Sequence, residues 1–272
     1  MTGPRRRRYR YRGRSRYGSV WRSPAPARFR RESLTERVLI LLVVAVVLGI
    51  TIGLILPRVN GGVGRLTGRY TATGDAAQTL QGLTVDDHAR PGRQYRREAF
   101  GFKETDEDGN GCNVREDVLT RDLTDLRTTT PGGCKVASGR LQDPYTGRTI
   151  EFVRGPKTSS AVQIDHVVAL ENAWRSGASK WDTARRYRFG NDPYNLLAVD
   201  GPANQAKGSA SADYWLPENK DYQCSYVARQ IAVKDKYSLS VTSSEKQAML
   251  AVLHTCPGQP LPQDRRSSAF GG

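Results

Sequence analysis

The apolar residues of the chain form one long uninterrupted run and a set of shorter, periodic runs. Residues 38–56, VLILLVVAVVLGITIGLIL, contain no charged side chain, and Thr51 is their one polar residue. A helix of about 20 apolar residues is long enough to span the hydrocarbon core of a bilayer. We therefore predict one transmembrane helix over residues 38–56.

A cleaved signal peptide is the alternative interpretation of this run. The run is longer than the usual apolar core of a signal peptide, the region before it is 37 residues long, and no clear Ala-x-Ala cleavage site follows it. These features favour an uncleaved anchor. Secretion after signal cleavage stays the alternative.

The two clearest helices of the remaining sequence come late in the chain. Residues 219–237 place apolar and aromatic side chains on one helical face. A second helix is predicted to follow, because Thr242-x-x-Glu245 matches the capping box that opens many helices. We expect the two helices to form an antiparallel hairpin.

The centre of the sequence predicts two strands and a helix. An apolar run that starts at Val162 ends in the adjacent pair Asp165 and His166, and a second short apolar strand begins at Asn195. Asn204 opens the segment that follows, which is expected to be helical. The order is strand, insertion, strand and helix, so we predict an α+β fold that contains a ββα unit.

Helix and turn signals fill the gaps between these elements. Within the insertion, one helix is expected over residues 169–176, and Ser179-x-x-Asp182 predicts the cap of another. After the second strand, the dipeptide Gly201-Pro202 predicts a turn.

Composition divides the chain into five segments. These are an Arg-rich tail over 1–37, the transmembrane helix over 38–56, a linker rich in Gly, Thr and Arg over 57–93, a folded domain over 94–256, and a tail over 257–272. Both tails are expected to be disordered, because neither has an apolar period.

The positive charge of the protein is concentrated in its first segment. Residues 1–37 hold 13 Arg and two acidic residues, which is +11 of the formal net charge of +15, whereas residues 70–272 carry 26 basic and 25 acidic groups. This asymmetry predicts a cytoplasmic N-terminus and an extracytoplasmic domain. We expect the tail to bind anionic lipid. Arg interleaved with aromatic residues is also typical of nucleic-acid-binding arms, which is the alternative.

All four cysteines follow the apolar run, on the side that is predicted to be oxidising. No C-x-x-C spacing is present, so disulfides are favoured over metal ligation. In the expected helix hairpin, Cys224 near the start of one helix lies beside Cys256 at the end of the other. This pairing leaves Cys112 to pair with Cys134.

The ββα region resembles HNH nucleases in the variant whose third motif residue is Asn. The wider runs QIDHVVALENAW, FGNDPYNLLAVDGPANQAKG and WLP resemble exported HNH endonucleases of actinobacteria, which are related to the C-terminal nuclease part of GmrSD restriction enzymes. The similarity covers about residues 95–256 and implies a ββα-metal core with additional helices. Two departures stand out, namely Ala169 where many relatives have Pro and the long spacing between His166 and Asn195.

The resemblance implies a role for each of four polar residues. His166 would be the general base, Asp165 and Asn204 would bind a divalent cation, and Asn195 would hold the loop that carries His166. An imidazole titrates near neutral pH, and oxygen ligands suit Mg²⁺ or Mn²⁺. The implied activity is metal-dependent hydrolysis of phosphodiester bonds in nucleic acid, with DNA favoured over RNA as the substrate.

Three basic residues are expected to contact substrate phosphates: Lys207, one helical turn after Asn204, and Arg185 and Arg186 of the insertion. The nearly neutral charge of residues 70–272 leaves a second class of function open. In that alternative, the protein is a surface binding or scaffold protein on a catalytically inactive HNH fold.

The segment over residues 106–117 partly matches a calcium-binding EF-hand loop. Its matching positions are Asp106, Asp108, Asn110, Gly111 and Asp117. No clear helix precedes the segment, and a disulfide at Cys112 would already constrain it. A Ca²⁺ site and a loop closed only by a disulfide are both open interpretations.

Overall fold

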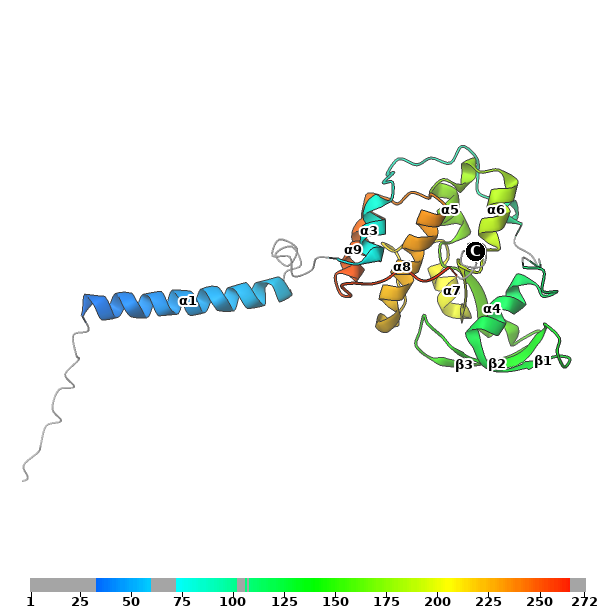
Figure 1. Ribbon diagram of the computed structural model, residues 1–272, viewed down its shortest axis with the longest axis horizontal. Coiled ribbons are helices and arrows are strands. Elements are labelled where there is room, and N and C mark those ends of the chain that lie inside the picture. Colours follow the sequence, from blue (N-terminus) through cyan, green and yellow to red (C-terminus); the bar gives the residue numbers. More distant parts are fainter. Residues whose placement is uncertain (1–32, 60–71, 102–105, 107, 265–272) are drawn as a thin grey trace, which may run out of the picture. The chain divides into compact units, whose positions relative to one another are not determined.

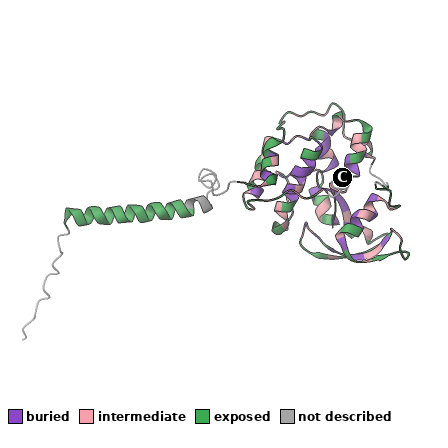
Figure 2. Cartoon of the chain, viewed as in Figure 1, coloured by how far each residue is buried: buried purple, intermediate pink, exposed green. Residues whose placement is uncertain are grey.

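Figure 1 shows the computed structural model of the chain, which describes residues 33–59, 72–101, 106 and 108–264. The chain divides after Ile55 into two units. The first contains most of helix α1 (Leu34–Val59), whose described side chains are exposed (Figure 2). Residues 34–55 are long and apolar enough to cross a membrane, a criterion that a signal sequence also meets. An apolar helix over the predicted residues is confirmed, and its position in a membrane stays a prediction. Residues 1–32 of the Arg-rich tail lie outside the described residues.

The second unit mixes helices and strands, as the sequence predicted. Its α-helices are α3 (Asp75–Gly82), α4 (Val114–Asp122), α5 (Leu170–Arg175), α6 (Thr183–Gly190), α7 (Gly201–Lys207), α8 (Lys220–Lys236) and α9 (Ser243–Leu253). Its strands are β1 (Leu123–Thr128), β2 (Val136–Gln142), β3 (Thr149–Val153), β4 (Val162–His166) and β5 (Leu196–Asp200). Short 3₁₀ turns are η1 (Arg97–Phe100), η2 (Ser159–Ala161) and η3 (Ala178–Lys180).

The strands form two antiparallel sheets, one of three strands in the order β1-β2-β3 and one hairpin of β4 and β5. In the hairpin, Val162 pairs with Asp200 and His166 pairs with Leu196. All five residues of β5 are buried. Alternate residues of a strand point to opposite faces, so β5 must pack on both sides.

Two clusters of apolar side chains cover the two faces of the hairpin. Leu196 and Ala198 pack with residues of α4 and the three-stranded sheet, while Leu197 and Val199 pack in a cluster that includes residues of α3, α8 and α9. The β4–β5 hairpin is therefore held between two parts of the core. The predicted order of strand, insertion, strand and helix is present as β4, α5 with α6, β5 and α7.

The segment predicted as a linker contains a core helix. Ala76, Ala77 and Leu80 of α3 are buried in the cluster that includes α8 and α9, and Leu83 after the helix is buried too. Packing therefore begins well before residue 94. The apolar pattern did not predict this helix, because the buried face of α3 consists mainly of two alanines and one leucine.

The start of the expected C-terminal tail is also packed. The backbone N–H of Ala76 donates to the carbonyl of Gln259, Leu261 packs against the core cluster of α3, and Lys236 forms an ion pair with Asp264 at 2.7 Å. Residues 257–264 are therefore not a loose tail. Residues 265–272 lie outside the part of the chain that the structure describes.

Two helix starts differ from the sequence prediction. Helix α6 is capped by Asp182 itself, whose side chain accepts from the N–H of Arg185. Gly201-Pro202 opens α7 instead of forming a turn before it. A proline is compatible with the first turn of a helix, since its missing N–H would have had no partner there. The Asp200 side chain caps α7 by accepting from the N–H of Ala203.

The predicted helix hairpin and both predicted disulfides are confirmed. Helices α8 and α9 begin after the caps Asn219 and Thr242. Cys224 is bonded to Cys256 with the Cα atoms 6.4 Å apart, and Cys112 is bonded to Cys134 with the Cα atoms 5.3 Å apart.

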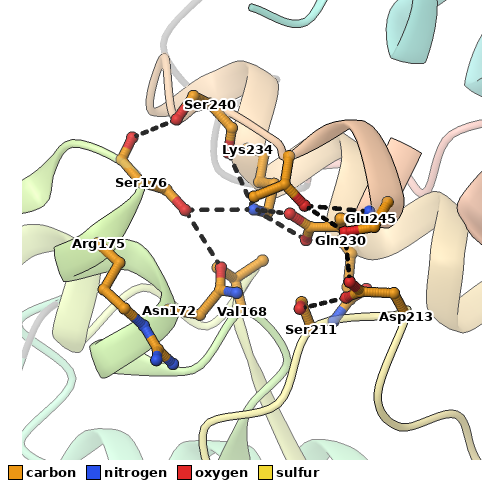
Figure 3. A network of polar contacts seen from close by, with 12 residues as sticks. Val168, Asn172, Arg175, Ser176, Ser211, Asp213, Gln230, Lys234, Ser240 and Glu245 are labelled. Carbon is orange, nitrogen blue, oxygen red and sulfur yellow. Dashed lines mark hydrogen bonds and ion pairs between the residues drawn. The ribbon is translucent and has the colours of Figure 1, made fainter. Parts of the chain in front are cut away.

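A buried ion pair joins α8 to α9. Lys234 of α8 is fully buried, and its Nζ lies 2.9 Å from the carboxylate of Glu245 and donates to the carbonyl of Ser240 at 3.0 Å (Figure 3). Glu245 is the final residue of the predicted capping box. Its N–H donates to Thr242 as expected, but its carboxylate binds Lys234.

We predict that Lys234→Met destabilises the protein by about 3 kcal/mol or more, because it leaves the Glu245 carboxylate buried without its cation. The measurement is chemical denaturation followed by circular dichroism. Lys220→Met is the matched control, since Lys220 is an exposed lysine at the start of the same helix. Equal stability of the two variants would contradict a structural role for the pair.

Candidate functional site

Helix α7 is attached to strand β4 by two polar contacts. Lys207 Nζ donates to Oδ1 of Asp165 at 2.9 Å, and Asn204 Nδ2 donates to Oε1 of Gln163 at 2.9 Å. Residues three apart in a helix and residues two apart in a strand each lie on one face. The Asn-x-x-Lys spacing of the helix therefore matches the Gln-x-Asp spacing of the strand, and α7 covers this face of β4.

A tyrosine from the turn between β2 and β3 completes the contacts of Asp165. The hydroxyl of Tyr145 donates to Oδ2 of Asp165 at 2.5 Å. Lys207 also donates to the carbonyl of His166 at 2.9 Å, and all of these side chains are buried. Burial raises the pKa of Asp165, while the Lys207 ammonium and the Tyr145 hydroxyl act in the opposite direction. Each oxygen of this carboxylate thus already has a donor.

The side chain of His166, the last residue of β4, has a different partner from that of Asp165. Its ring nitrogen Nε2 lies 2.7 Å from the carbonyl oxygen of Gly190. A carbonyl only accepts hydrogen bonds, so Nε2 carries the proton and Nδ1 carries the lone pair of the neutral ring. The hydrogen bond to Gly190 therefore sets the tautomer of His166.

Gly190 is the last residue of α6, within the insertion between the two strands. A Cβ atom at this position would lie 2.8 Å from the carbonyl oxygen of Phe100, closer than real Cβ contacts allow. Glycine is the residue that lets the end of α6 approach η1 closely. The insertion thus supplies the acceptor that orients His166, a contribution that the sequence did not predict.

His166 is held in its neutral form. Burial lowers the pKa of the imidazole from 6.5 to about 3, the positive charges of Arg97 and Lys207 act in the same direction, and the hydrogen bond to Gly190 opposes them. The ring is therefore unprotonated at neutral pH, and in the free protein it is a weaker base than an ordinary imidazole. Arg97 is a residue of the site that the sequence analysis did not identify.

Asn195 lies just before β5 and connects its start to the loop that follows β4. Its Oδ1 accepts from the N–H of Val168 at 2.8 Å, its Nδ2 donates to the carbonyl of Val168 at 3.1 Å, and its own carbonyl accepts from the N–H of Val167 at 2.8 Å. Asn195 is fully buried. These are the contacts that its expected role of holding the loop after His166 requires, and the role itself stays a prediction.

A cleft of about 370 Å³ opens at the end of the hairpin. Asp165, His166 and Asn204 all line it, so three of the expected site residues are brought together. The wall is completed by residues of the segment before α4, of β4, of α5 and of the loop after α7, including Tyr95, Arg97, Gln163, Glu171 and Ser209.

The two expected metal ligands differ in their fit to a hard cation. Asp165 does not fit, because Lys207 and Tyr145 already occupy its oxygens and a second cation would lie beside a buried ammonium. Asn204 fits, because its Nδ2 donates to Gln163 and its amide oxygen is a ligand type that Mg²⁺ accepts together with waters and phosphates. The described residues contain no group of three or more His, Cys, Asp or Glu side chains placed to hold a metal.

The three basic residues expected at substrate phosphates have other partners. Lys207 is 1% exposed and binds Asp165, so it cannot reach a phosphate without breaking the ion pair. Arg185 donates to the carbonyl of Tyr237 and stacks on Trp181, and Arg186 donates to the carbonyl of Ala99. None of the three lines the cleft of His166. For Lys207 the expectation is wrong, because the ammonium is needed to neutralise a buried carboxylate.

The loop expected as a possible calcium site is closed by hydrogen bonds of its own. The amide of Asn110 donates to Asp108 and to Asp117, and the carboxylate of Asp106 accepts from backbone N–H groups of Gly109 and Gly111. Residue 107 and residues 102–105 lie outside the described part of the chain. Calcium binding by this loop stays a prediction.

Besides Arg97, three residues of the site were not predicted from the sequence, for different reasons. Gln163 could have been found by pairing the alternation of β4 with the helical spacing of Asn204 and Lys207. Tyr145 and Gly190 reach the site from a turn and a helix end, and no local pattern links them to His166. Contacts of this kind depend on tertiary structure alone.

A pair of buried strands, a covering helix and a polar cleft thus define the site of a mixed α/β domain. The family model for GmrSD restriction endonucleases, C-terminal domain, matches residues 113–252. The chain therefore belongs to this family. An uncharacterized secreted protein of Arthroderma benhamiae is 42% identical over 183 residues, which cover 66% of this chain and 84% of that protein. No solved structure matches.

We predict that His166 makes the stability of the protein depend on pH below about 6.5. In that range the unfolded chain binds a proton at His166, while the folded protein does not do so until about pH 3. The free energy of unfolding should therefore fall as the pH is lowered from about 6.5 toward 3. Urea denaturation at several pH values measures this, with His166→Gln as the control that cannot take up the proton. Parallel pH curves for the two proteins would contradict the burial of a neutral imidazole.

Proposed function

We propose that this protein is a membrane-anchored, extracytoplasmic endonuclease of the HNH type, which hydrolyses phosphodiester bonds of nucleic acid with a divalent cation. One observation carries the proposal: His166 lies in a cleft with Asn204, and its Nε2 contacts the carbonyl of Gly190, which makes Nδ1 the basic atom of the neutral ring. The family of GmrSD C-terminal domains adds a nuclease-related function as the class.

In the proposed reaction, Nδ1 of His166 takes a proton from a water molecule as the oxygen of that water attacks phosphorus. The bond from phosphorus to the 3′ oxygen breaks, the leaving oxygen takes a proton from solvent, and His166 returns its proton to solvent. Before a phosphate binds, burial makes the imidazolium form of His166 unfavourable. The negative charge of the bound phosphate raises the proton affinity of the ring at the moment when a base is needed.

The neighbouring residues keep the ring in place. Asn195 fixes the backbone after His166, Gly190 fixes its tautomer, and Arg97 places a positive charge at the wall of the cleft. A divalent cation, Mg²⁺ or Mn²⁺, would be held by the amide oxygen of Asn204 and would stabilise negative charge on the phosphoryl oxygens. Gln163 orients that amide by accepting from its Nδ2.

We predict that His166→Ala lowers plasmid cleavage by full-length protein in detergent at least about 10²-fold, the usual scale for losing a general base. Asn204→Ala should also lower cleavage, and extra Mg²⁺ or Mn²⁺ should partly restore it, whereas no metal concentration should rescue His166→Ala. Asn195→Ala should show a mixed defect, because it displaces the loop of His166.

His88→Ala serves as the matched control, since His88 is an exposed histidine that does not line the cleft. It should cleave at the wild-type rate. A folded His166→Ala protein that cleaves like this control would exclude the imidazole as the base and would favour an inactive binding or scaffold protein.

We also propose that α1 anchors the protein with the nuclease unit outside the cytoplasm. The support is the arginine-rich flank before an apolar helix and the two disulfides of the second unit. Protease added to intact cells should digest the second unit and leave the N-terminal tail intact. A soluble mature protein that begins after residue 57 would instead establish a cleaved signal.

A further inference from the structure

The segment that leads into the cleft presents three exposed arginines within five residues. Arg93, Arg96 and Arg97 are all exposed, and Glu98 is the one acidic residue among their immediate neighbours. Figure 1 shows this part of the chain passing over α5 and α6, at the end of the unit away from the three-stranded sheet. We name these three residues the arginine rim.

The arginine rim is held by its backbone, which leaves its side chains at the surface. Nε1 of Trp174 donates to the carbonyl of Arg93 at 2.9 Å, and the ring of Tyr95 packs edge-on against Trp174. Phe100 is fully buried at the end of η1. Because the backbone is already anchored in this way, presenting these charged side chains to a ligand costs little further backbone conformational freedom.

The arginine rim is continuous with the cleft of His166. Tyr95 and Arg97 line that cleft, and the charge of Arg97 is close enough to lower the pKa of His166. A second cleft, of about 600 Å³, is lined by both signs of charge, namely Asp86, Asp87, Asp213 and Glu245 together with Arg175 and Lys207. The arginine rim instead presents three exposed positive charges, which attract a polyanion that extends from the cleft of His166.

We propose that the arginine rim binds the sugar-phosphate backbone of the polynucleotide on one side of the bond that is cleaved. This inference rests on the proposed function for the position of the cleaved bond. Planar guanidinium groups form paired hydrogen bonds with phosphate oxygens.

The test is hydrogen exchange of the full-length protein in detergent, measured while a short DNA duplex is titrated in EDTA. Protection of the peptide that contains residues 93–100 reports binding at the rim alone, so duplex bound to the Arg-rich tail does not contribute. Three phosphate contacts change the slope of log K against log salt by about 2.7. The midpoint of the titration is the duplex concentration that gives half-maximal protection of residues 93–100. The variant Arg93→Gln, Arg96→Gln, Arg97→Gln should therefore raise this midpoint by on the order of 10²-fold at about 0.1 M salt.

The matched control removes three exposed charges around the three-stranded sheet, through Arg127→Gln, Lys135→Gln and Lys157→Gln. It should keep the wild-type midpoint and slope. A rim variant with the same midpoint as this control would overturn the inference, as would a wild-type protein that cleaves DNA without protection of residues 93–100. Protection at the rim without any cleavage would support the inference and contradict the proposed function.

Discussion

The buried ion pair between Lys207 and Asp165 is the interaction on which the geometry of the cleft depends. Two charges that are both removed from water are stable only when their remaining hydrogen-bonding groups also find partners. Here Tyr145 and the carbonyl of His166 supply those partners, so β4, α7 and the turn between β2 and β3 meet at one point. Any substitution that breaks the pair leaves an uncompensated charge next to His166.

Asp165 and His166 both line the cleft, but they bind different partners, which separates two tasks. Asp165 holds the strand to α7 through Lys207, and His166 contacts the carbonyl of Gly190. This division explains why Asp165 does not resemble a metal ligand, although it directly precedes the proposed base. It also gives the long insertion a purpose, since α6 ends at the residue that fixes the tautomer of the ring.

Local patterns in the sequence predicted what depends on local structure. The helix hairpin of α8 and α9 followed from helical spacing and a capping box, and it brought Cys224 to Cys256. Helix α3 was missed because two alanines give little apolar signal, although a core helix against α8 needs small side chains. The partner of Lys207 was missed because an exposed lysine and a lysine that neutralises a buried carboxylate look the same in a sequence.

The tautomer of His166 tests the central claim most directly, because it depends on Asp165, Asn195 and Gly190 together. Nitrogen NMR of protein labelled at histidine, with His166→Gln to assign the signal, distinguishes the two neutral rings and the imidazolium. We expect the neutral ring protonated at Nε2 throughout about pH 5 to 8, with no titration near the usual value of about 6.5. A proton at Nδ1, or titration near that usual value, would contradict the claim that the buried cleft holds His166 as a base.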